Sequence, residues 1–134
     1  MKEKRVLIVH PSRGRPAEAE KAFFNHVNLR KNLGTKIKYI FCLDFDDPRL
    51  PEYNTSLYAE NVEVAFMVNE NVGCVQAANR AYNRKLLDTV DLVILTSDDM
   101  RLCYAWDFEL FSVLDLHGNC IAIKTTQPGA VDND

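Results

Sequence analysis

The sequence predicts an α/β protein in which a mostly parallel β-sheet is flanked by helices in three α/β/α layers. Short apolar runs alternate along the chain with stretches whose apolar residues recur every three or four positions. The first pattern is typical of buried strands and the second of amphipathic helices. Strands that alternate with helices form parallel sheets, because each helix supplies the crossover between two strands. The 134 residues fit one domain, and a hydrophobic content of 47% is enough for one core.

Five apolar runs are predicted to form the strands. The run that begins after Asp91 is the most prominent, because it consists of Leu, Val and Ile residues and ends at Thr96. Such a run is typical of a strand that is buried on both faces, in the middle of a parallel sheet. In chain order, the predicted strands cover residues 6–10, 37–43, 62–68, 92–96 and 120–124.

Three helices are predicted between these strands. The first begins at Pro16, a residue suited to the first helical turn, and continues to a C-terminal cap at Gly34. The second follows Asn71 as its N-cap, and the third covers residues 104–116. Residues 48–60 contain two prolines and are predicted to form a surface loop or a short irregular helix.

Charge and composition restrict the partners and the compartment. The formal net charge of −3 argues against nucleic acid as a partner. No apolar run is long enough to span a membrane and the basic start lacks a signal-peptide profile, so we expect no membrane span and a cytoplasmic location. The cysteines show no Cys-x-x-Cys spacing and are expected to be free thiols: Cys42, Cys74, Cys103 and Cys120.

Two adjacent carboxylates, Asp98 and Asp99, follow the fourth predicted strand. Ligands of open α/β sheets bind beyond the carboxyl ends of the strands, where these side chains are expected to lie. Two negative charges at one place repel each other unless a cation or a shared proton intervenes. Because Mg²⁺ prefers carboxylate oxygens and often takes phosphate as a further ligand, the pair predicts a metal–diphosphate site. The alternative is an ordinary solvated turn after a strand.

A basic loop and an acidic loop follow the first two predicted strands. Arg13 and Arg15 lie after the first strand, and Asp44, Asp46 and Asp47 come directly after the second. Arginine binds phosphate oxygens in a bidentate way, and a carboxylate can accept the ring N–H of a base or a ribose hydroxyl. Together with the acidic pair, these loops predict a sugar-nucleotide site at the carboxyl ends of the strands. Taken alone, each loop is explained by a solvated turn.

In its order of motifs, the chain resembles the N-terminal half of glycosyltransferase family 2 and related enzymes of the GT-A fold. The resemblance covers residues 4–124. It rests on Pro-Ser-Arg-Gly-Arg-Pro after the first strand, an acid after the second, Asn-x-Asn-x-Gly with Ala-Ala-Asn-Arg in the second helix, and an acidic motif of the Asp-x-Asp type. It implies the fold of nucleotide-diphospho-sugar transferases, a nucleotide-diphospho-sugar donor, a manganese or magnesium ion, and an acceptor of unknown identity.

The resemblance also implies roles for individual residues. Asp99 would bind the metal, with Asp98 beside it at the nucleotide-sugar. Asn79 and Arg80 would line the nucleotide-sugar cleft. The base and the ribose would be contacted by Pro11, Ser12, Arg13, Arg15 and Asp44.

Two departures from the family pattern bear on activity. Ser97 occupies the position of the first acid of Asp-x-Asp, which weakens one contact to ribose or metal. The resemblance ends before the half that binds the acceptor and supplies the catalytic base, and Asp107 and Glu109 are explained by a solvated helix face. We therefore expect donor binding with little or no sugar transfer by this chain alone. We also expect a second copy or another partner over apolar sheet surface near residues 120–124.

Other classes of function have less support. His10, His26 and His117 form neither a metal-binding spacing nor a catalytic triad. The sequence has no Gly-x-Ser-x-Gly motif of serine hydrolases and no Gly-rich phosphate loop. Two alternatives stay open: a nucleotide-binding module of Rossmann-like fold that performs no chemistry, and an interaction protein that keeps only the scaffold.

Overall fold

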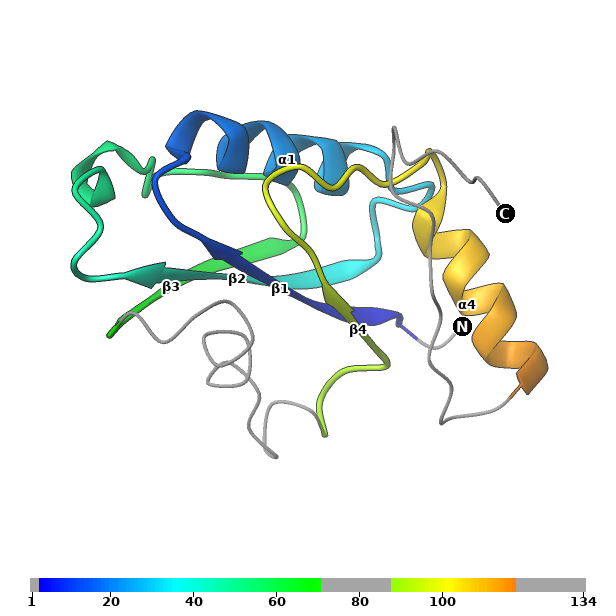
Figure 1. Cartoon of the computed structure of the whole chain (residues 1–134). Coiled ribbons are helices and arrows are strands. Elements are labelled where there is room, and N and C mark those ends of the chain that lie inside the picture. Colours follow the sequence, from blue (N-terminus) through cyan, green and yellow to red (C-terminus); the bar gives the residue numbers. More distant parts are fainter. Residues whose placement is uncertain (1–2, 71–87, 118–134) are drawn as a thin grey trace, which may run out of the picture.

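The computed structural model describes residues 3–70 and 88–117 of the chain. In this part, four strands form one parallel sheet with the order β3-β2-β1-β4 (Figure 1). The strands are β1 (Arg5–Ser12), β2 (Lys36–Asp44), β3 (Val62–Asn69) and β4 (Leu92–Leu95). The predicted α/β class and parallel sheet are confirmed, and the bounds of these four strands lie close to the predicted ones.

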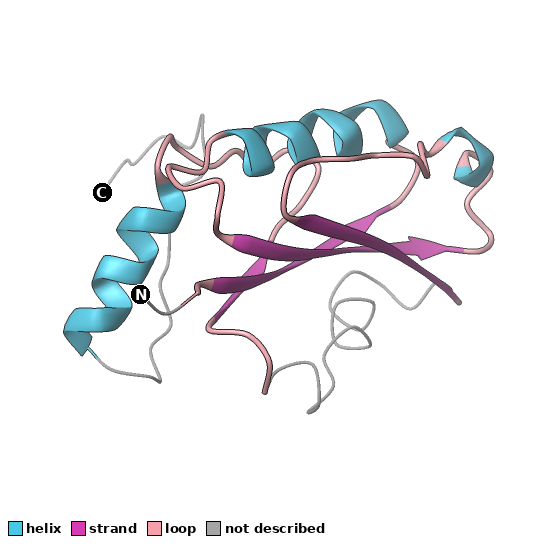
Figure 2. Cartoon of the chain, turned by 180° about the vertical axis from the view of Figure 1, so that it is seen from behind, coloured by secondary structure: helices cyan, strands magenta, loops and turns pink. Residues whose placement is uncertain are grey.

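Two helices accompany the sheet. α1 (Pro16–Asn28) lies along one face of the sheet, and α4 (Trp106–His117) lies near the amino end of β1 (Figures 1 and 2). Trp106 joins the two helices, because its indole N–H donates to the backbone carbonyl of His26 over 2.7 Å. Neither helix is long and apolar enough to cross a membrane.

Some predicted elements cannot be compared with the structure. A short 3₁₀ turn, η1 (Leu50–Glu52), interrupts the connection that the sequence predicted as irregular. The helix predicted after Asn71 and the strand predicted at residues 120–124 lie outside the described residues. Of the three predicted layers, the described residues therefore show the sheet and the layer that contains α1.

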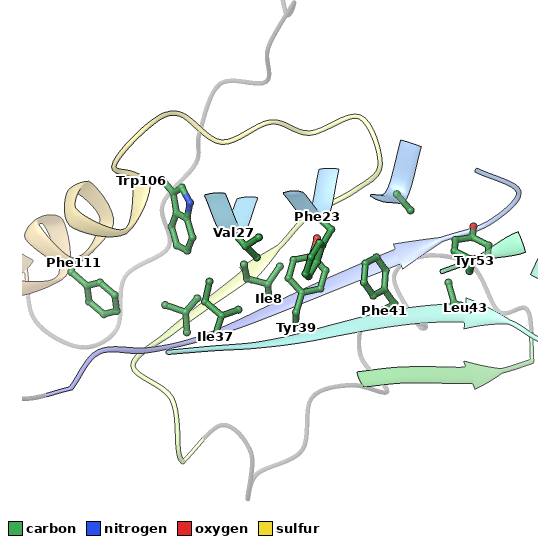
Figure 3. Close-up of a cluster of buried hydrophobic side chains, with 12 residues drawn as sticks. Ile8, Phe23, Val27, Ile37, Tyr39, Phe41, Leu43, Tyr53, Trp106 and Phe111 are labelled. Atoms are coloured by element: carbon green, nitrogen blue, oxygen red, sulfur yellow. The ribbon is translucent and has the colours of Figure 1, made fainter. Parts of the chain in front are cut away.

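The core between α1 and the sheet is built from side chains on one face of the strands. Val6 and Ile8 occupy alternate positions of β1 and face α1. From α1, Phe23 packs edge-on against Tyr39 of β2, with ring centroids 4.9 Å apart (Figure 3). A separate cluster of buried side chains lies on the opposite face: Leu7, Val9, Ile40 and Cys42.

β4 is less buried than the sequence predicted. Val93 and Leu95 are 38% and 51% exposed, whereas Leu92 and Ile94 pack against the core that faces α1. The strands that are buried on both faces are β1, whose residues 6–10 are fully buried, and β2. The prediction failed because an apolar run does not by itself distinguish a strand covered on one face from one covered on both.

α1 ends earlier than predicted. Its last helical residue is Asn28, whereas the sequence predicted a helix as far as Gly34. The carboxylate of Asp107 accepts the backbone N–H groups of Lys31 and Asn32 over 2.7 and 3.2 Å. These two N–H groups are thereby satisfied outside a helix, and the chain can turn toward β2. The prediction that Asp107 lies on a solvated face is also wrong, because its side chain is buried.

Candidate functional site

The strand order creates a switch point between β1 and β4, because β1 is followed by β2 on one side and paired with β4 on the other. Open parallel sheets bind ligands at such points, in the crevice beyond the carboxyl ends of the strands. Three polar segments lie at these ends here: residues 12–15 at the end of β1, 44–47 at the end of β2 and 97–101 after β4. We call these segments together the switch-point site.

Asp98 is the buried centre of this site. Its Oδ1 lies 2.7 Å from Nε2 of His10, and its Oδ2 accepts the hydroxyl of Ser12 over 2.9 Å. His10 also lies 2.7 Å from the hydroxyl of Tyr39, and Ser12 lies 2.8 Å from the hydroxyl of Tyr53. His10 and Ser12 are two positions apart on β1 and therefore share the face that α1 covers. The network ties the loop after β4 to β1 and β2.

Each ring nitrogen of His10 faces one polar partner in this network. Nε2 faces Oδ1 of Asp98, and Nδ1 faces the hydroxyl of Tyr39. Tyr39 keeps its proton because burial, and then the charge of Asp98, raises its pKa well above the ordinary value. Both oxygens of Asp98 thus face polar groups within the protein.

Arg13, in the loop after β1, is paired with two carboxylates at the end of the neighbouring strand β2. Its Nη1 lies 2.6 Å from Asp46 Oδ1 and 3.0 Å from Asp44 Oδ2, and these two hydrogen bonds raise the pKa of the guanidinium. The next residue, Gly14, has a positive φ of 69° and donates its N–H to Asp47 Oδ2 over 2.7 Å. Glycine adopts this conformation without strain. The loop after β1 is therefore held against the loop after β2.

Asp99 differs from its neighbour in being exposed. The hydroxyl of Ser97 donates to Asp99 Oδ1 over 2.7 Å. This hydrogen bond, the backbone N–H of Asp99 itself and the charges of Arg15 and Arg101 hold the pKa of the Asp99 carboxyl below its ordinary value. Asp99 is therefore an ionised carboxylate at the surface, with two arginines in its surroundings.

A second buried histidine supports the end of β4. Nε2 of His26 in α1 lies 2.7 Å from the hydroxyl of Thr96, and its Nδ1 lies 3.1 Å from Oδ1 of Asn25. The same Asn25 oxygen accepts the backbone N–H of Leu102 over 2.8 Å. Burial above all lowers the pKa of His26 to about 3, so its ring is neutral and acts as a structural link.

The structure brings most of the predicted site residues to one edge of the sheet. Asn79 and Arg80 lie outside the described residues. The predicted residues at the carboxyl ends of β1, β2 and β4 are Pro11, Ser12, Arg13, Arg15, Asp44, Asp98 and Asp99. Asp98 differs from the expected ligand-binding pair because it is buried, and Ser12 and Asp44 are buried as well.

Four residues of the site were missed from the sequence: His10, Tyr39, Tyr53 and Arg101. A signal was available for His10, which lies two positions before Ser12 on a predicted strand and therefore shares its face. Tyr39 and Tyr53 had no such signal, because their contacts depend on which strands are neighbours and on how the irregular connection folds.

The described residues offer one accessible carboxylate for a metal ion at the acidic pair. In residues 3–70 and 88–117, no group of three or more His, Cys, Asp or Glu side chains is arranged to hold a metal. Asp99 is exposed, whereas Asp98 is used by protein donors. A hard cation at Asp99 would take its other ligands from phosphate and water, which is how Mg²⁺ is commonly held at phosphate-transfer sites.

Two cavities lie at the opposite end of the sheet. One, of about 480 Å³, is lined by the first residues of β1, β2 and β3. The other, of about 850 Å³, lies between α4 and the loop after α1, where Lys31 Nζ is 4.1 Å from the ring centre of Phe108. Neither is lined by residues of the switch-point site. We place the candidate site at the switch point, where the complementary charges meet.

No protein-family model matches the chain, and no curated protein or solved structure shows significant similarity to it. The function is therefore inferred from the residues of the switch-point site and the sequence motifs that they belong to.

Proposed function

We propose that this chain binds a nucleotide-diphospho-sugar at the switch-point site, as the donor-binding part of a glycosyltransferase of the GT-A type. One observation carries the proposal: Ser12 at the end of β1 donates to Asp98 after β4 over 2.9 Å. This bond connects the arginine-containing loop with the segment that carries Asp99. Cations suited to phosphate and a carboxylate suited to a metal thus share the edge at which parallel sheets bind nucleotides.

Asp44 is the proposed acceptor for a ring N–H of the base or a hydroxyl of the ribose. Its Oδ2 accepts from Arg13 over 3.0 Å, and its Oδ1 makes no hydrogen bond with the described residues. Arg13 thereby orients the carboxylate, and the second oxygen stays available for a ligand. Asn79 and Arg80, to which the family resemblance gives a role at the nucleotide-sugar, lie outside the described residues.

The proposed metal site is at Asp99, with manganese or magnesium as the ion. When bound, such an ion neutralises charge on the departing diphosphate. Asp99 supplies an ionised oxygen, and Ser97 fixes the side chain by its hydrogen bond of 2.7 Å. Asp98 holds the segment in place from inside the protein.

A second candidate is a nucleotide-binding module that performs no chemistry. Sugar transfer requires a base that removes a proton from the hydroxyl of the acceptor, whose identity is unknown. The observation that favours this candidate is that all five carboxylates of the site accept hydrogen bonds from protein donors: Asp44, Asp46, Asp47, Asp98 and Asp99. None of them has a geometry that assigns it as the base.

Calorimetric titration with UDP-sugars and GDP-sugars, in the presence and absence of Mn²⁺, tests the proposal. We expect binding that Mn²⁺ strengthens, and about a tenfold or greater loss of the Mn²⁺-dependent affinity in Asp99→Asn. Asp115→Asn is the matched control, because Asp115 is an exposed carboxylate on α4 and should leave binding unchanged. The proposal is wrong if none of these nucleotides binds, or if Asp99→Asn keeps the full response to Mn²⁺.

An assay with labelled nucleotide-sugars separates the two candidates. Turnover of about 1 to 1,000 per second, the usual range of enzymes, would identify a complete transferase and exclude the binding module. Binding without turnover on a broad panel of acceptors would favour the module.

A further inference from the structure

Arg101 is anchored by one edge of its guanidinium group. Its Nη1 donates to the backbone carbonyl oxygens of Asp98 and Met100, each over 2.9 Å. These two bonds use both hydrogens of Nη1. The other edge, formed by Nε and Nη2, makes no hydrogen bond or ion pair with the residues that the structure describes. The side chain of Arg101 is half-buried and its Nη1 is held by two carbonyl groups. The position of the Nε–Nη2 edge is therefore already restricted.

Arg13, which the sequence predicted as a nucleotide-binding residue, has a different environment from Arg101. Its Nη1 is held by Asp44 and Asp46, so two negative charges lie beside one positive charge. A phosphate that approached Arg13 would have to compete with these carboxylates or lie next to them. The guanidinium of Arg101 is held instead by two backbone carbonyl oxygens, and Arg101 is not ion-paired with any acidic side chain of residues 3–70 and 88–117.

We propose that Arg101 is a diphosphate-binding residue of the switch-point site, with Arg15 as its partner, and that Arg13 instead holds the loops after β1 and β2 together. The Nε–Nη2 edge of a guanidinium matches two phosphate oxygens in a bidentate way. The Nη1 anchor reduces the number of conformations that binding would have to restrict. Arg15 is exposed, and its backbone N–H donates to the hydroxyl of Tyr53 over 3.3 Å, which connects it to the network around Asp98.

The position of Arg101 follows from the same network that defines the site. Its anchor is the carbonyl of Asp98, whose side chain is bonded to Ser12 next to Arg13. Arg101 therefore lies in the segment after β4, on the other side of the switch point from the loop after β1. A diphosphate that bridges these two segments would contact Arg101 on one side and Arg15 on the other, with Asp99 able to share a metal with it.

This inference concerns the diphosphate group alone. It rests on the proposed function only for the idea that the diphosphate belongs to a nucleotide-sugar. Inorganic pyrophosphate is therefore the probe, titrated calorimetrically with and without Mn²⁺. We expect Arg101→Gln to weaken pyrophosphate binding by about 10- to 100-fold, since charge-assisted hydrogen bonds are lost. Arg101→Lys keeps the positive charge but lacks the bidentate Nε–Nη2 edge, so it should bind pyrophosphate more tightly than Arg101→Gln and less tightly than the unmodified protein. Arg13→Gln should change the affinity by less than about threefold.

Arg5→Gln is the matched control, because Arg5 is a half-exposed arginine at the amino end of β1 and lies 3.7 Å from Asp91. It should bind pyrophosphate as the unmodified protein does. Thermal unfolding of each variant shows whether it is folded at the titration temperature. If Arg101→Gln does not fold, Arg101→Lys is used for the test instead, since its ammonium group can still donate to the carbonyl oxygens of Asp98 and Met100.

Three outcomes would overturn the inference. The first is that the unmodified protein does not bind pyrophosphate, and the second is that Arg101→Gln, or Arg101→Lys if the Gln variant does not fold, binds it as tightly as the unmodified protein. The third is a larger loss of affinity in Arg13→Gln than in Arg101→Gln. The inference and the proposed function can fail independently of each other. Pyrophosphate binding that depends on Arg101, without binding of any nucleotide-sugar, would support the inference and contradict the proposed donor. Binding of nucleotide-sugars that is unaffected in Arg101→Gln would support the proposed donor and contradict the inference about Arg101.

Discussion

Oδ1 of Asp98 lies 2.7 Å from Nε2 of His10, so a buried carboxylate after β4 is bound to an imidazole in the central strand β1. An Asn side chain has a single acceptor oxygen, and its NH₂ group would face either the Nε2–H of His10 or the hydroxyl of Ser12. We therefore expect Asp98→Asn to lower the free energy of unfolding by about 1–3 kcal/mol. Urea unfolding followed by circular dichroism measures this change.

Asp46→Asn is the control for Asp98→Asn, because Asp46 belongs to the same site but is half exposed. Its effect on the free energy of unfolding should stay within about 0.5 kcal/mol, as is usual for surface substitutions. Equal unfolding midpoints for the two variants would show that the buried network around Asp98 does not contribute to stability.

The neutral ring of His26 predicts a pH dependence of stability. Burial lowers its pKa in the folded protein from an ordinary 6.5 to about 3. Below about pH 6.5 the unfolded chain binds more protons than the folded one, so the free energy of unfolding falls as the pH decreases toward 3. This group contributes a slope of up to about 1.4 kcal/mol per pH unit.

Chemical unfolding between about pH 5 and pH 8 tests this dependence in the unmodified protein and in His26→Gln. The variant also loses the contact with Thr96, which lowers its stability at every pH. Only the slope is therefore diagnostic, and it should be shallower in the variant between about pH 5 and 6.5. Parallel curves would mean that His26 is protonated in the folded protein or titrates alike in both states.

The two cysteines of the described residues are free and should react at very different rates. Cys42 is buried in the core face opposite α1, and burial raises the pKa of its thiol to about 11, whereas Cys103 is exposed. Because the thiolate is the nucleophile, we expect Cys42 to be alkylated by iodoacetamide about 100-fold more slowly than Cys103 at pH 8. Peptide mapping by mass spectrometry identifies the labelled residue. Protein unfolded in urea is the control, and equal labelling of the folded protein would contradict the buried position of Cys42.

The strands could be predicted because their signal is local. An uninterrupted apolar run such as Val6 to Val9 indicates a buried strand whatever its neighbours are. The order of the strands is not local, and it decides which runs are covered. The run at Leu92 to Leu95 was predicted to lie in the middle of the sheet, but β2 and β1 are the inner strands of the described sheet, and Val93 and Leu95 of β4 are exposed.

The site could be predicted only as far as it follows from strand ends. Ser12, Arg13 and Asp98 could be placed at one edge, because carboxyl ends of parallel strands meet there. Their pairing could not, since Ser12 and Asp98 are 86 positions apart and meet only through the neighbouring positions of β1 and β4. The anchoring of Arg101 by backbone carbonyls leaves no pattern in the sequence, so its difference from Arg13 became visible only in the structure.

Asp107 shows the same limit at a helix end and leads to the last prediction. Its carboxylate accepts the N–H groups of Lys31 and Asn32 and the hydroxyl of Thr35, the last over 3.0 Å, in a buried environment. In Asp107→Asn one carboxylate oxygen is replaced by an NH₂ group that faces these donors. We expect the free energy of unfolding to fall by about 1–3 kcal/mol. Urea unfolding measures the loss.

Hydrogen exchange distinguishes this local role of Asp107 from a general loss of stability. The amide protons of Lys31 and Asn32 should exchange faster in Asp107→Asn under native conditions, because their acceptor is the replaced group. Glu109→Gln is the matched control, since Glu109 lies on the same helix but is exposed, and it should stay within about 0.5 kcal/mol of the unmodified protein. Unchanged exchange at both amides, together with an unchanged midpoint, would show that the end of α1 at Asn28 is set by something other than Asp107.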